Sequence, residues 1–390
     1  MRFSYARNLI GAAAMAVVGL TATAATASAE GRVVAIGDVH GAYDQLVAIL
    51  QRAELIDAET HWIGGEATLV QTGDLFDRGL QVRDVMDLLM TIQTEAAAAG
   101  GQVIVLLGNH EGMNLTGFYR DVNPDIYATF ADDKSKKRRK SAFARFQKYW
   151  HKAVAAAGYE PQPMTGEIKQ QWMTAHPLGR VEYTEAIGPD GVYGKWLRTL
   201  PIAVVIDDVL FIHGGIGPAL AGVTVDEINQ RAAEEMAVYD SAREYLVNHG
   251  LMPTTLGLDA MVTAARKQNP PEPALAALLE ADSWMIRSGD GPLWFRGSAK
   301  WDEDEQGEEM VELLAGVGAQ FVVGGHTPQR PRRIQTRFDG RVFLIDTGML
   351  SSHYEDGQPS ALVIEGDTFT AIYLDDSEVV ETRDVLPAAA

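Results

Sequence analysis

Short apolar runs alternate with amphipathic stretches of helix length over the first third of the chain. Residues 33–36, 68–71 and 102–107 are mostly apolar runs of strand length, and they predict buried strands. Between them, residues 44–53 carry apolar side chains at helical spacing, and residues 82–99 repeat that spacing until two glycines end it. Strands that alternate with helices in this way predict a mainly parallel sheet with helices packed against it.

Two later segments, at about residues 119–195 and 219–290, are polar and rich in helical signals. We interpret both as helical insertions over the rim of the sheet, because the motifs described below lie on either side of them. Residues 203–206 and 209–212 predict a hairpin. A second, antiparallel sheet stacked on the first is the expected result, within one domain that spans residues 30–386. Further strands are predicted at residues 341–345, 361–364 and 368–374.

Composition narrows the possible classes of protein. A chain of 390 residues can form a substantial core. Cysteine is absent, which excludes disulfides, cysteine-ligated zinc and thiol nucleophiles. The net charge of −20 argues against a nucleic-acid-binding surface. Any phosphorylated ligand would therefore have to be attracted by a local positive site rather than by the overall field.

The first 29 residues resemble a cleavable export signal. Arg2 and Arg7 precede an apolar stretch at residues 9–20, and Ala27-Ser28-Ala29 forms a cleavage site before Glu30. A membrane anchor is the alternative, but the apolar stretch is shorter than the roughly 20 residues that a span requires. We expect cleavage after Ala29, a periplasmic or secreted protein, and no stable membrane insertion. The sequence carries no signal for an oligomeric state.

Five apolar strands end in glycine together with Asp, Asn or His. Ligands of α/β proteins bind at the carboxyl ends of the strands, so this pattern predicts a metal centre at a sheet edge. The five motifs are Gly37–Gly41, Gly73–Gly79, Gly108–Glu111, His213–Gly215 and Gly325–Thr327.

The residue types within these motifs favour a centre with two divalent metal ions. Residues i and i+2 of an extended strand end project to the same side, so Asp38 and His40 are predicted to bind one ion together. Asp74 is the expected bridge between the two ions. The mixture of carboxylate, imidazole and amide suits Mn, Fe or Zn better than Ca or Mg. The expected ligands of the second ion are Asp74, Asn109, His213 and His326.

The remaining polar residues of the motifs are predicted to handle the substrate. His110 follows Asn109, but neighbours on a strand end point in opposite directions, so His110 is the expected general acid for the leaving group. Asp77 is predicted to hold its other ring nitrogen. Arg78 and Arg296 are the expected phosphate-binding residues, because a guanidinium can hold two phosphate oxygens.

Three other features receive separate interpretations. Glu111 is expected to anchor its loop rather than to bind metal. The basic run Lys134–Lys140 is interpreted as a solvated helix face, with a substrate-docking patch as the alternative. His353 and Tyr354 follow a predicted strand and are interpreted as lying outside the pocket, with a place at its border as the alternative.

The five motifs, in this order, resemble the signature blocks of the calcineurin-like metallophosphoesterases. The Asp77-Arg78 pair resembles the phosphoprotein phosphatase (PPP) branch in particular. Four further segments are similar to the bacterial Shewanella-like protein phosphatases: Gly112–Thr116, Trp196–Arg198, Gly291–Gly297 and Ile345–Met349. The resemblance covers nearly all of residues 32–375. It implies an α/β fold in which a β-sandwich of two mixed sheets is flanked by helices, and it implies the same metal, acid and arginine residues as above.

Some positions depart from the family pattern. Phe76 stands where many PPP members have Val, Phe118–Arg120 replaces a Gly-Asp-Leu-Arg type of run, and Ser352–Gly357 is less glycine-rich than expected. These departures affect the rim of the pocket and so the substrate preference.

Together, these observations predict an exported phosphatase that hydrolyses phosphomonoesters by direct attack of a metal-bridging hydroxide. The expected substrates are proteins or peptides phosphorylated on Ser, Thr or Tyr, or small phosphomonoesters. A phosphodiesterase or dinucleoside polyphosphate hydrolase is the alternative within the same chemistry. An inactive metal-binding protein is the alternative from another class.

Overall fold

The computed structural model describes residues 31–156, 160, 163–253, 257–267 and 272–382. The predicted export signal lies outside these residues. Among the residues that are described, no helix is long and apolar enough to cross a membrane.

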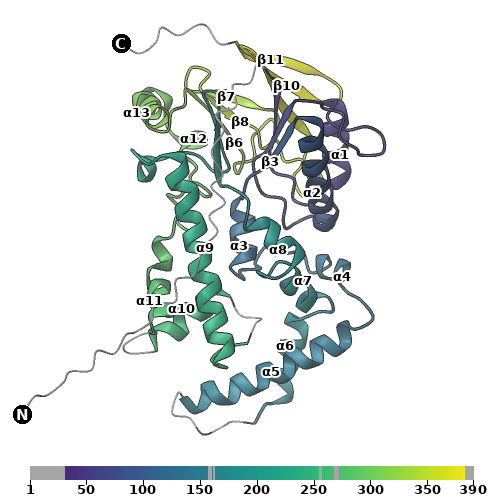
Figure 1. Cartoon of the computed structure of the whole chain (residues 1–390), viewed down its shortest axis with the longest axis vertical. Helices are drawn as coiled ribbons and strands as arrows, with labels where there is room; N and C mark the ends of the chain where they lie inside the picture. The colour runs from purple at the N-terminus through teal and green to yellow at the C-terminus, as the bar shows by residue number, and fades with distance from the viewer. Residues whose placement is uncertain (1–30, 157–159, 161–162, 254–256, 268–271, 383–390) are drawn as a thin grey trace, which may run out of the picture.

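Two mixed β-sheets form the body of the molecule (Figure 1). The first sheet has the strand order β11-β10-β9-β1-β2-β3, and the second has the order β4-β5-β6-β8-β7. The strands of the first sheet are β1 (Val33–Ile36), β2 (Thr68–Gln71), β3 (Gln102–Val105), β9 (Ser360–Glu365), β10 (Thr368–Tyr373) and β11 (Ser377–Thr382). The strands of the second sheet are β4 (Ala203–Ile206), β5 (Val209–Ile212), β6 (Phe321–Gly324), β7 (Gln335–Arg337) and β8 (Val342–Leu344).

The pairing of the strands confirms two mixed sheets and corrects one detail. Strands β1, β2 and β3 are parallel, and β4 and β5 form the predicted hairpin. The second sheet was expected to be antiparallel, but β5, β6 and β8 run parallel to one another. The reason is that a long helical segment connects β5 to β6, so β6 enters the sheet in the same direction as β5.

The alternation of side chains along β1 places the core on both faces of the first sheet. Val33 and Ala35 face the second sheet, and between the two sheets Phe343 of β8 stacks on Phe369 of β10 with ring centroids 4.5 Å apart. Val34 and Ile36 point to the other face, where they join the cluster that contains the apolar sides of the flanking helices. Every residue of β1 is buried, because both of its faces are covered.

Helices cover the sheets and extend beyond them. Helices α1 (Tyr43–Arg52) and α2 (Val82–Ala99) flank the first sheet, and α12 (Gly297–Lys300) and α13 (Glu303–Gly316) lie beside the second (Figure 1). The predicted helix at residues 82–99 agrees with α2, which ends at Gly100 in a left-handed conformation.

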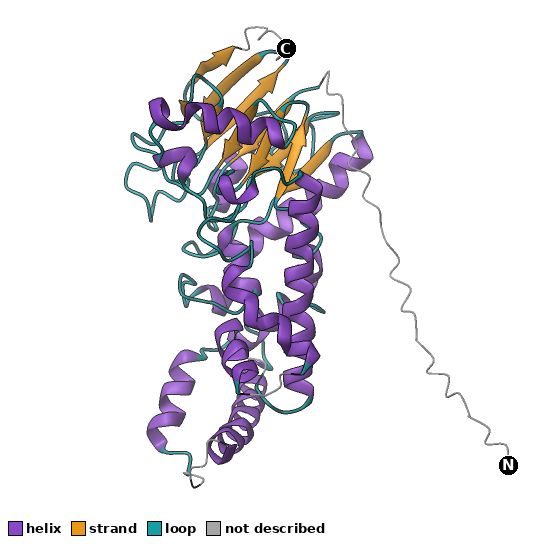
Figure 2. Ribbon diagram, turned by 90° about the vertical axis from the view of Figure 1, so that its left-hand side faces the viewer, coloured by secondary structure: helices purple, strands orange, loops and turns teal. Residues whose placement is uncertain are grey.

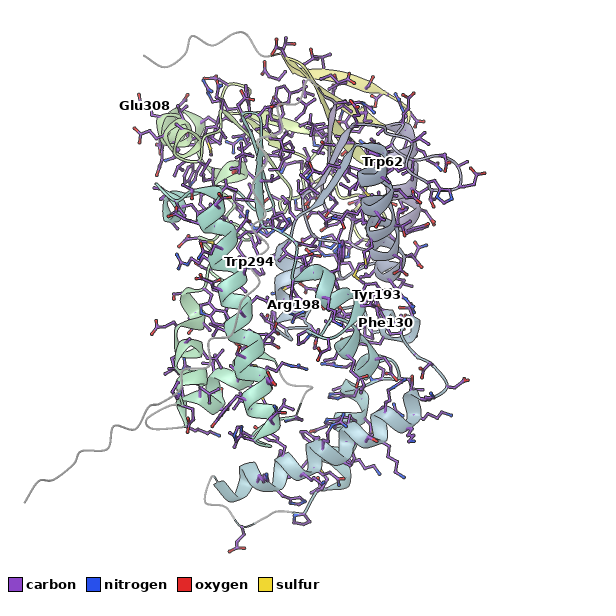
Figure 3. The ribbon with its side chains drawn as sticks, viewed as in Figure 1. Trp62, Phe130, Tyr193, Arg198, Trp294 and Glu308 are labelled. Carbon is purple, nitrogen blue, oxygen red and sulfur yellow. The ribbon has the colours of Figure 1, made fainter. Side chains whose placement is uncertain are left out.

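Except for α3, which precedes the first predicted insertion, the remaining helices lie in or next to the two predicted insertions and extend away from the sheets (Figure 2). Arg198 joins the two insertions by donating Nε and Nη2 to the carboxylate of Asp240, at 2.6 and 2.8 Å (Figure 3). The helices around the first insertion are α3 (Asn109–Leu115), α4 (Ile126–Thr129), α5 (Ser135–Ala156), α6 (Gly166–Ala175), α7 (Arg180–Ala186) and α8 (Val192–Leu197). Those of the second are η1 (Pro218–Leu220), α9 (Val225–Asn248), α10 (Leu258–Arg266), α11 (Pro273–Ala276) and η2 (Ala277–Ser283).

Candidate metal centre

The six residues predicted to bind metal meet where the carboxyl ends of five strands converge. None of their side chains is more than 5% exposed. The prediction of a single sheet edge is wrong, because β1, β2 and β3 belong to the first sheet and β5 and β6 to the second. The centre is therefore built between the ends of two stacked sheets. Its members are Asp38, His40, Asp74, Asn109, His213 and His326.

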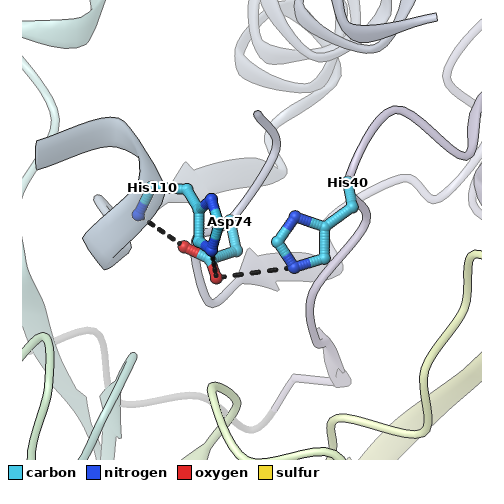
Figure 4. A group of neighbouring side chains, drawn as sticks. All are labelled: His40, Asp74 and His110. Carbon is cyan, nitrogen blue, oxygen red and sulfur yellow. Dashed lines mark hydrogen bonds and ion pairs between the residues drawn. The ribbon is translucent and has the colours of Figure 1, made fainter. Parts of the chain in front are cut away.

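Asp74 lies at the middle of this cluster. Its carboxylate is 3.6 Å from His40 Nε2 and 3.3 Å from His213 Nε2. Figure 4 shows Asp74 between His40 and His110. The described residues contain two groups with ligand atoms within 4.8 Å of one another, and Asp74 belongs to both. The groups are His40 with Asp74 and His110, and Asp74 with His213 and His326.

Backbone carbonyls fix the orientation of three of these imidazoles. Nδ1 of His40 lies 2.7 Å from the carbonyl oxygen of Phe76, and Nδ1 of His213 lies 2.9 Å from that of Thr72. The Nε2 atoms of both rings are thereby turned towards Asp74. His326 uses Nε2 instead, 3.1 Å from the carbonyl oxygen of Trp294, which leaves its Nδ1 for the centre. A carbonyl that holds one ring nitrogen is the usual way to orient a metal-binding histidine.

Five of the predicted site residues have a left-handed backbone. The φ angles are +49° at His40, +60° at Asp74, +70° at Asp77, +64° at Arg78 and +66° at His326. A residue with a Cβ atom rarely adopts this conformation, and such strain concentrates at functional sites. Strand alternation was the expected reason why residues 38 and 40 share a side. The actual reason is that the chain leaves β1 and turns at His40.

Glycine is required at two positions by the carboxylates beside it. A Cβ atom on Gly325 would lie 2.3 Å from Oδ1 of Asp38, and one on Gly108 would lie 2.3 Å from Oδ1 of Asp74. These two glycines therefore let the backbone approach the carboxylates of Asp38 and Asp74 closely.

The Gly108–Glu111 motif begins a helix rather than extending a strand. Asn109 and His110 form the first turn of α3, so the expectation that they diverge as strand neighbours is wrong in its reasoning. The carboxylate of Glu111 accepts hydrogen bonds from the amides of Gly108 (2.6 Å) and Asp74 (2.8 Å). It also accepts from Leu75 (2.8 Å) and Phe76 (3.2 Å). Glu111 thus joins two motif loops, in agreement with the anchoring role predicted for it.

His110 lies at one end of a buried chain of hydrogen bonds. Its Nδ1 is 2.5 Å from Oδ2 of Asp77, and the other oxygen of Asp77 accepts from Asn114 Nδ2 at 3.0 Å. Tyr183 then donates its hydroxyl to Oδ1 of Asn114 at 2.6 Å. Sequence reasoning missed Asn114 and Tyr183. Asn114 lies four residues after His110, on the same helical face, and this spacing is the signal that was available.

The two predicted phosphate-binding arginines lie on different sides of the cluster. Arg78 places Nη2 3.1 Å from His110 Nε2, and its Nη1 contacts the hydroxyl of Tyr354. Tyr354 therefore borders the site, which was the alternative interpretation of this residue. Arg296 donates Nη1 to the carbonyl oxygen of His326 at 3.0 Å and to Thr327 Oγ1 at 2.9 Å.

The charges of the cluster fit divalent cations. Burial, reinforced by Asp346 and Asp74, raises the pKa of Asp38 well above its usual value. Asp346 was not predicted; it is fully buried, and its Oδ2 has no hydrogen-bond partner among the described residues. Three buried carboxylates in one place are costly unless cations compensate them. The residues present therefore suit a metal centre.

The protonation states of the histidines agree with this interpretation. Burial, with His213 and Arg296 nearby, lowers the pKa of His326 to about 2, so this ring is neutral and able to bind metal. Burial alone would lower the pKa of His213, but Asp74 and Asp38 raise it to about 9. A proton on His213 balances those two carboxylates, as a bound cation would.

A cavity of about 320 Å³ adjoins the centre on the side of the second insertion. Its walls include Met113 of α3, Leu258 of α10, Ile286 and Trp294. Trp294 is the residue whose carbonyl holds His326, so the cavity and the centre share a wall. Phe118, which is 44% exposed, stands at this cavity.

The fold and the cluster together define a metal-dependent phosphoesterase. A sequence model of the calcineurin-like phosphoesterase family matches residues 31–330, and the chain belongs to this family. The family implies divalent metal ions, for which the Asp and His groups above provide ligands.

Named relatives agree with this assignment over most of the chain. Shewanella-like protein phosphatase 1 of Plasmodium berghei is 27% identical over 367 residues, which cover 92% of this chain and 77% of the relative. The crystal structure of a cold-active protein-tyrosine phosphatase from a psychrophilic Shewanella species is 26% identical, with a TM-score of 0.59. The aligned region covers 90% of this chain and 80% of the chain in that crystal structure. The predicted resemblance to the Shewanella-like protein phosphatases is thereby confirmed.

A more distant relative matches only part of the chain. The symmetrical bis(5'-nucleosyl)-tetraphosphatase of Salmonella paratyphi A is 30% identical over 137 residues, 33% of this chain and 43% of the relative.

Proposed function

We propose that this enzyme hydrolyses phosphomonoesters, and that its main substrates are proteins or peptides phosphorylated on Ser, Thr or Tyr. The observation that carries the proposal is the His110–Asp77 pair beside Asp74, with Arg78 within 3.1 Å of the imidazole. This pair supplies a proton for a leaving alkoxide or phenoxide next to a cationic side chain that binds phosphate. A protein that only binds metal has no use for such a pair.

Two sets of residues in this chain would each bind one of the two metal ions. Asp38, His40 and Asp74 would hold one metal ion. Divalent ions held there would supply Lewis-acid chemistry: they would lower the pKa of a water molecule towards about 7 and would polarise the phosphoryl group. The ligands of the other ion would be Asp74, Asn109, His213 and His326.

Substrate binding and proton transfer would fall to other side chains. Arg78 and Arg296 would bind the phosphate oxygens. His110, oriented by Asp77, would give its Nε2 proton to the leaving oxygen. Burial opposes charge on His110, but Asp74 and Asp77 raise its pKa, which favours the protonated form that an acid needs.

Two observations support a protein or peptide substrate. Two relatives that match along 92% and 90% of the chain are named as protein phosphatases, and one of them is a protein-tyrosine phosphatase. The apolar cavity beside the centre has room for a side chain that neighbours the phosphorylated residue. The tetraphosphatase match is confined to a third of the chain, so it favours a nucleotide substrate less.

A substrate panel tests the proposal. The purified protein would be assayed with Mn, Fe and Zn on phosphotyrosine, phosphoserine and phosphothreonine peptides, p-nitrophenyl phosphate, bis-p-nitrophenyl phosphate and dinucleoside polyphosphates. We expect turnover of the monoesters and a higher kcat/KM for at least one peptide. Faster hydrolysis of the diester or of the dinucleotides would overturn the proposal. Asp74→Asn serves as the control for contaminating phosphatase.

We also propose that the protein is exported to the periplasm or secreted after cleavage behind Ala29. The support is the sequence of residues 1–29 alone. N-terminal sequencing of the protein from its native cells should begin near Glu30. An intact Met1 would contradict the proposal.

A further inference from the structure

The most basic part of the chain lies in the first insertion, away from the metal centre. Residues 134–152 contain nine Lys or Arg and no Asp or Glu, whereas the rest of the chain has 24 Lys or Arg against 53 Asp or Glu. Nearly all of this segment forms α5, which lies at the end of the molecule opposite to the sheets (Figures 1 and 2). The proposed catalytic residues include none of these charges.

Four of these basic residues lie on one face of α5, and Lys134, directly before the first residue of the helix, continues their row; we call these five residues the basic stripe. They recur every three, four or eight residues, so they fall within a narrow sector of a helix with 3.6 residues per turn. All five are exposed, and none forms an ion pair with another described residue. The stripe is about 27 Å long at 1.5 Å per residue. Its members are Lys134, Lys137, Arg145, Lys148 and Lys152.

The opposite face of α5 holds the stripe in place. Phe143 is buried against Trp172 of α6, with ring centroids 5.1 Å apart. Arg138, which lies beside the stripe and not on the opposite face, donates Nη1 to Asp132 at 2.6 Å and to Glu182 of α7 at 3.0 Å. Because the packing of Phe143 fixes the rotation of the helix, the four cations of the stripe that lie on α5 face away from α6.

The position of the charges within α5 is unfavourable for the helix itself. Lys136, Lys137 and Lys140 are exposed in its first two turns, and no acidic residue lies in the first turn. The amino end of a helix carries a partial positive charge, which disfavours cations there. Helix stability therefore does not account for this placement, whereas an anionic partner would.

We propose that the basic stripe is a docking site for an acidic segment of the protein substrate. The inference rests on the proposed phosphatase activity. The main support for the docking site is charge complementarity. Most of this protein is strongly acidic and repels an acidic polypeptide, whereas the stripe attracts one. An extended segment of about eight residues matches its length. Docking at this distance from the centre raises the local concentration of the phosphorylated residue, so it lowers KM and leaves kcat unchanged.

An acidic polypeptide fits the stripe better than a membrane or a nucleic acid does. The stripe is a single row of charges, and it carries no exposed apolar side chain that would enter a lipid interface. The net negative charge of the whole chain repels a large anionic surface or a polyphosphate backbone more strongly than it repels a short acidic segment, because the segment carries fewer charges.

A binding measurement tests docking apart from catalysis. The probe is a fluorescein-labelled, unphosphorylated, Glu-rich peptide, and its anisotropy is followed with the full-length metal-loaded enzyme. The test variant combines Lys137→Glu, Arg145→Glu and Lys148→Glu. The control combines Arg52→Glu, Lys195→Glu and Lys267→Glu, which change the net charge equally at exposed sites off α5. We expect the test variant to weaken binding by at least about tenfold and the control to bind like wild type.

A kinetic measurement completes the test. For a phosphopeptide with the same acidic segment, the test variant should raise KM by about tenfold with kcat unchanged. Its activity on p-nitrophenyl phosphate should equal that of wild type, which also shows that it is folded. Equal peptide binding by the test variant and wild type would overturn the docking site. A second outcome would also overturn it: wild type binds phosphatidylglycerol vesicles or duplex DNA but not the peptide, and the test variant loses that binding.

The two proposals fail in different ways. If wild type binds the Glu-rich peptide but hydrolyses no phosphopeptide, the proposed function is wrong. If it hydrolyses phosphopeptides without regard to acidic segments, only the docking site is wrong.

Discussion

Nδ1 of His110 and Oδ2 of Asp77 lie 2.5 Å apart, and both side chains are buried. This contact fixes the imidazole so that Nε2 faces Asp74 and Arg78. The same ring also belongs to one of the two groups with metal-ligand spacing. His110 is therefore placed either to donate a proton or to bind metal, and the two roles predict different results.

Replacement of His110 by Asn separates these roles. As a general acid, His110 should contribute about 10²–10⁴-fold to turnover, and its loss should leave both metals bound. The loss should be larger for phenyl phosphate than for p-nitrophenyl phosphate, because phenol is the poorer leaving group. Metal content by mass spectrometry and kcat for both esters provide the test. Loss of a metal ion from the variant would assign His110 as a ligand instead.

Replacement of Asp74 by Asn should remove metal from the protein. The Asp74 carboxylate contacts the imidazoles of His40, His110 and His213, so its charge is central to both ligand groups. We expect less bound metal after dialysis and almost no activity, with partial recovery at high manganese concentration. The matched control is Asp44→Asn, which removes an equal charge from an exposed position on α1. Full metal content in the Asp74 variant would refute the bridging role.

Tyr183→Phe tests the support behind Asp77. The substitution leaves Oδ1 of Asn114 without its donor in a fully buried place, which should cost about 1–3 kcal/mol of stability. Asn114 should then hold Asp77 less firmly, so kcat should fall, though less than in His110→Asn. Urea unfolding and kcat measure the two effects. Tyr127→Phe, in the same aromatic cluster, should preserve kcat. An unchanged kcat in Tyr183→Phe would separate this hydrogen-bond chain from catalysis.

His176 should make the first insertion sensitive to acid. Burial, with Arg180 nearby, lowers the pKa of His176 from 6.5 to about 4. Its Nδ1 donates to the carbonyl oxygen of Trp172, and its Nε2 is buried without a partner among the described residues. The unfolded chain therefore binds the proton more readily between pH 6.5 and 4, so stability falls as the pH falls through this range.

The loss should reach about 3 kcal/mol at pH 4, because each pKa unit corresponds to about 1.4 kcal/mol. Unfolding followed by tryptophan fluorescence at several pH values measures it. His176→Phe retains a ring against Trp172 but cannot titrate, so its stability should depend less on pH. Equal pH dependence of the two proteins would contradict the assignment.

The sequence predicted which polar residues gather at the candidate metal centre, because the local pattern determines where most of them lie; that they bind metal stays a prediction. Asp38, Asp74, His213 and His326 each follow an apolar strand next to glycine, and the carboxyl ends of such strands gather at one place. The chain order of the motifs also carried the family resemblance, which the family match over residues 31–330 confirms.

Contacts between segments that are distant in the sequence could not be predicted from the local pattern of residues. Tyr183 joins the site from a segment far from the motifs, and nothing in its local sequence marks it. Asp346 follows an apolar strand near a glycine, as the motif residues do, and this signal was missed. The start of α3 at Asn109 was missed because Glu111, not a Ser or Thr before it, satisfies the amide of Gly108. Similarly, no local sequence signal predicts that contact between the rings of Phe143 and Trp172 packs α5 against α6.

Glu111 has a consequence for how the enzyme obtains its metals. Four amides from two loops are bound by this one carboxylate, so protein atoms alone hold the loops in position. The candidate ligands therefore stand close together without a bound ion, and we expect metal ions to enter and leave the site without unfolding of the chain. On that expectation, the metal supply of the surroundings, rather than the folding of the protein, would decide which ions the enzyme carries.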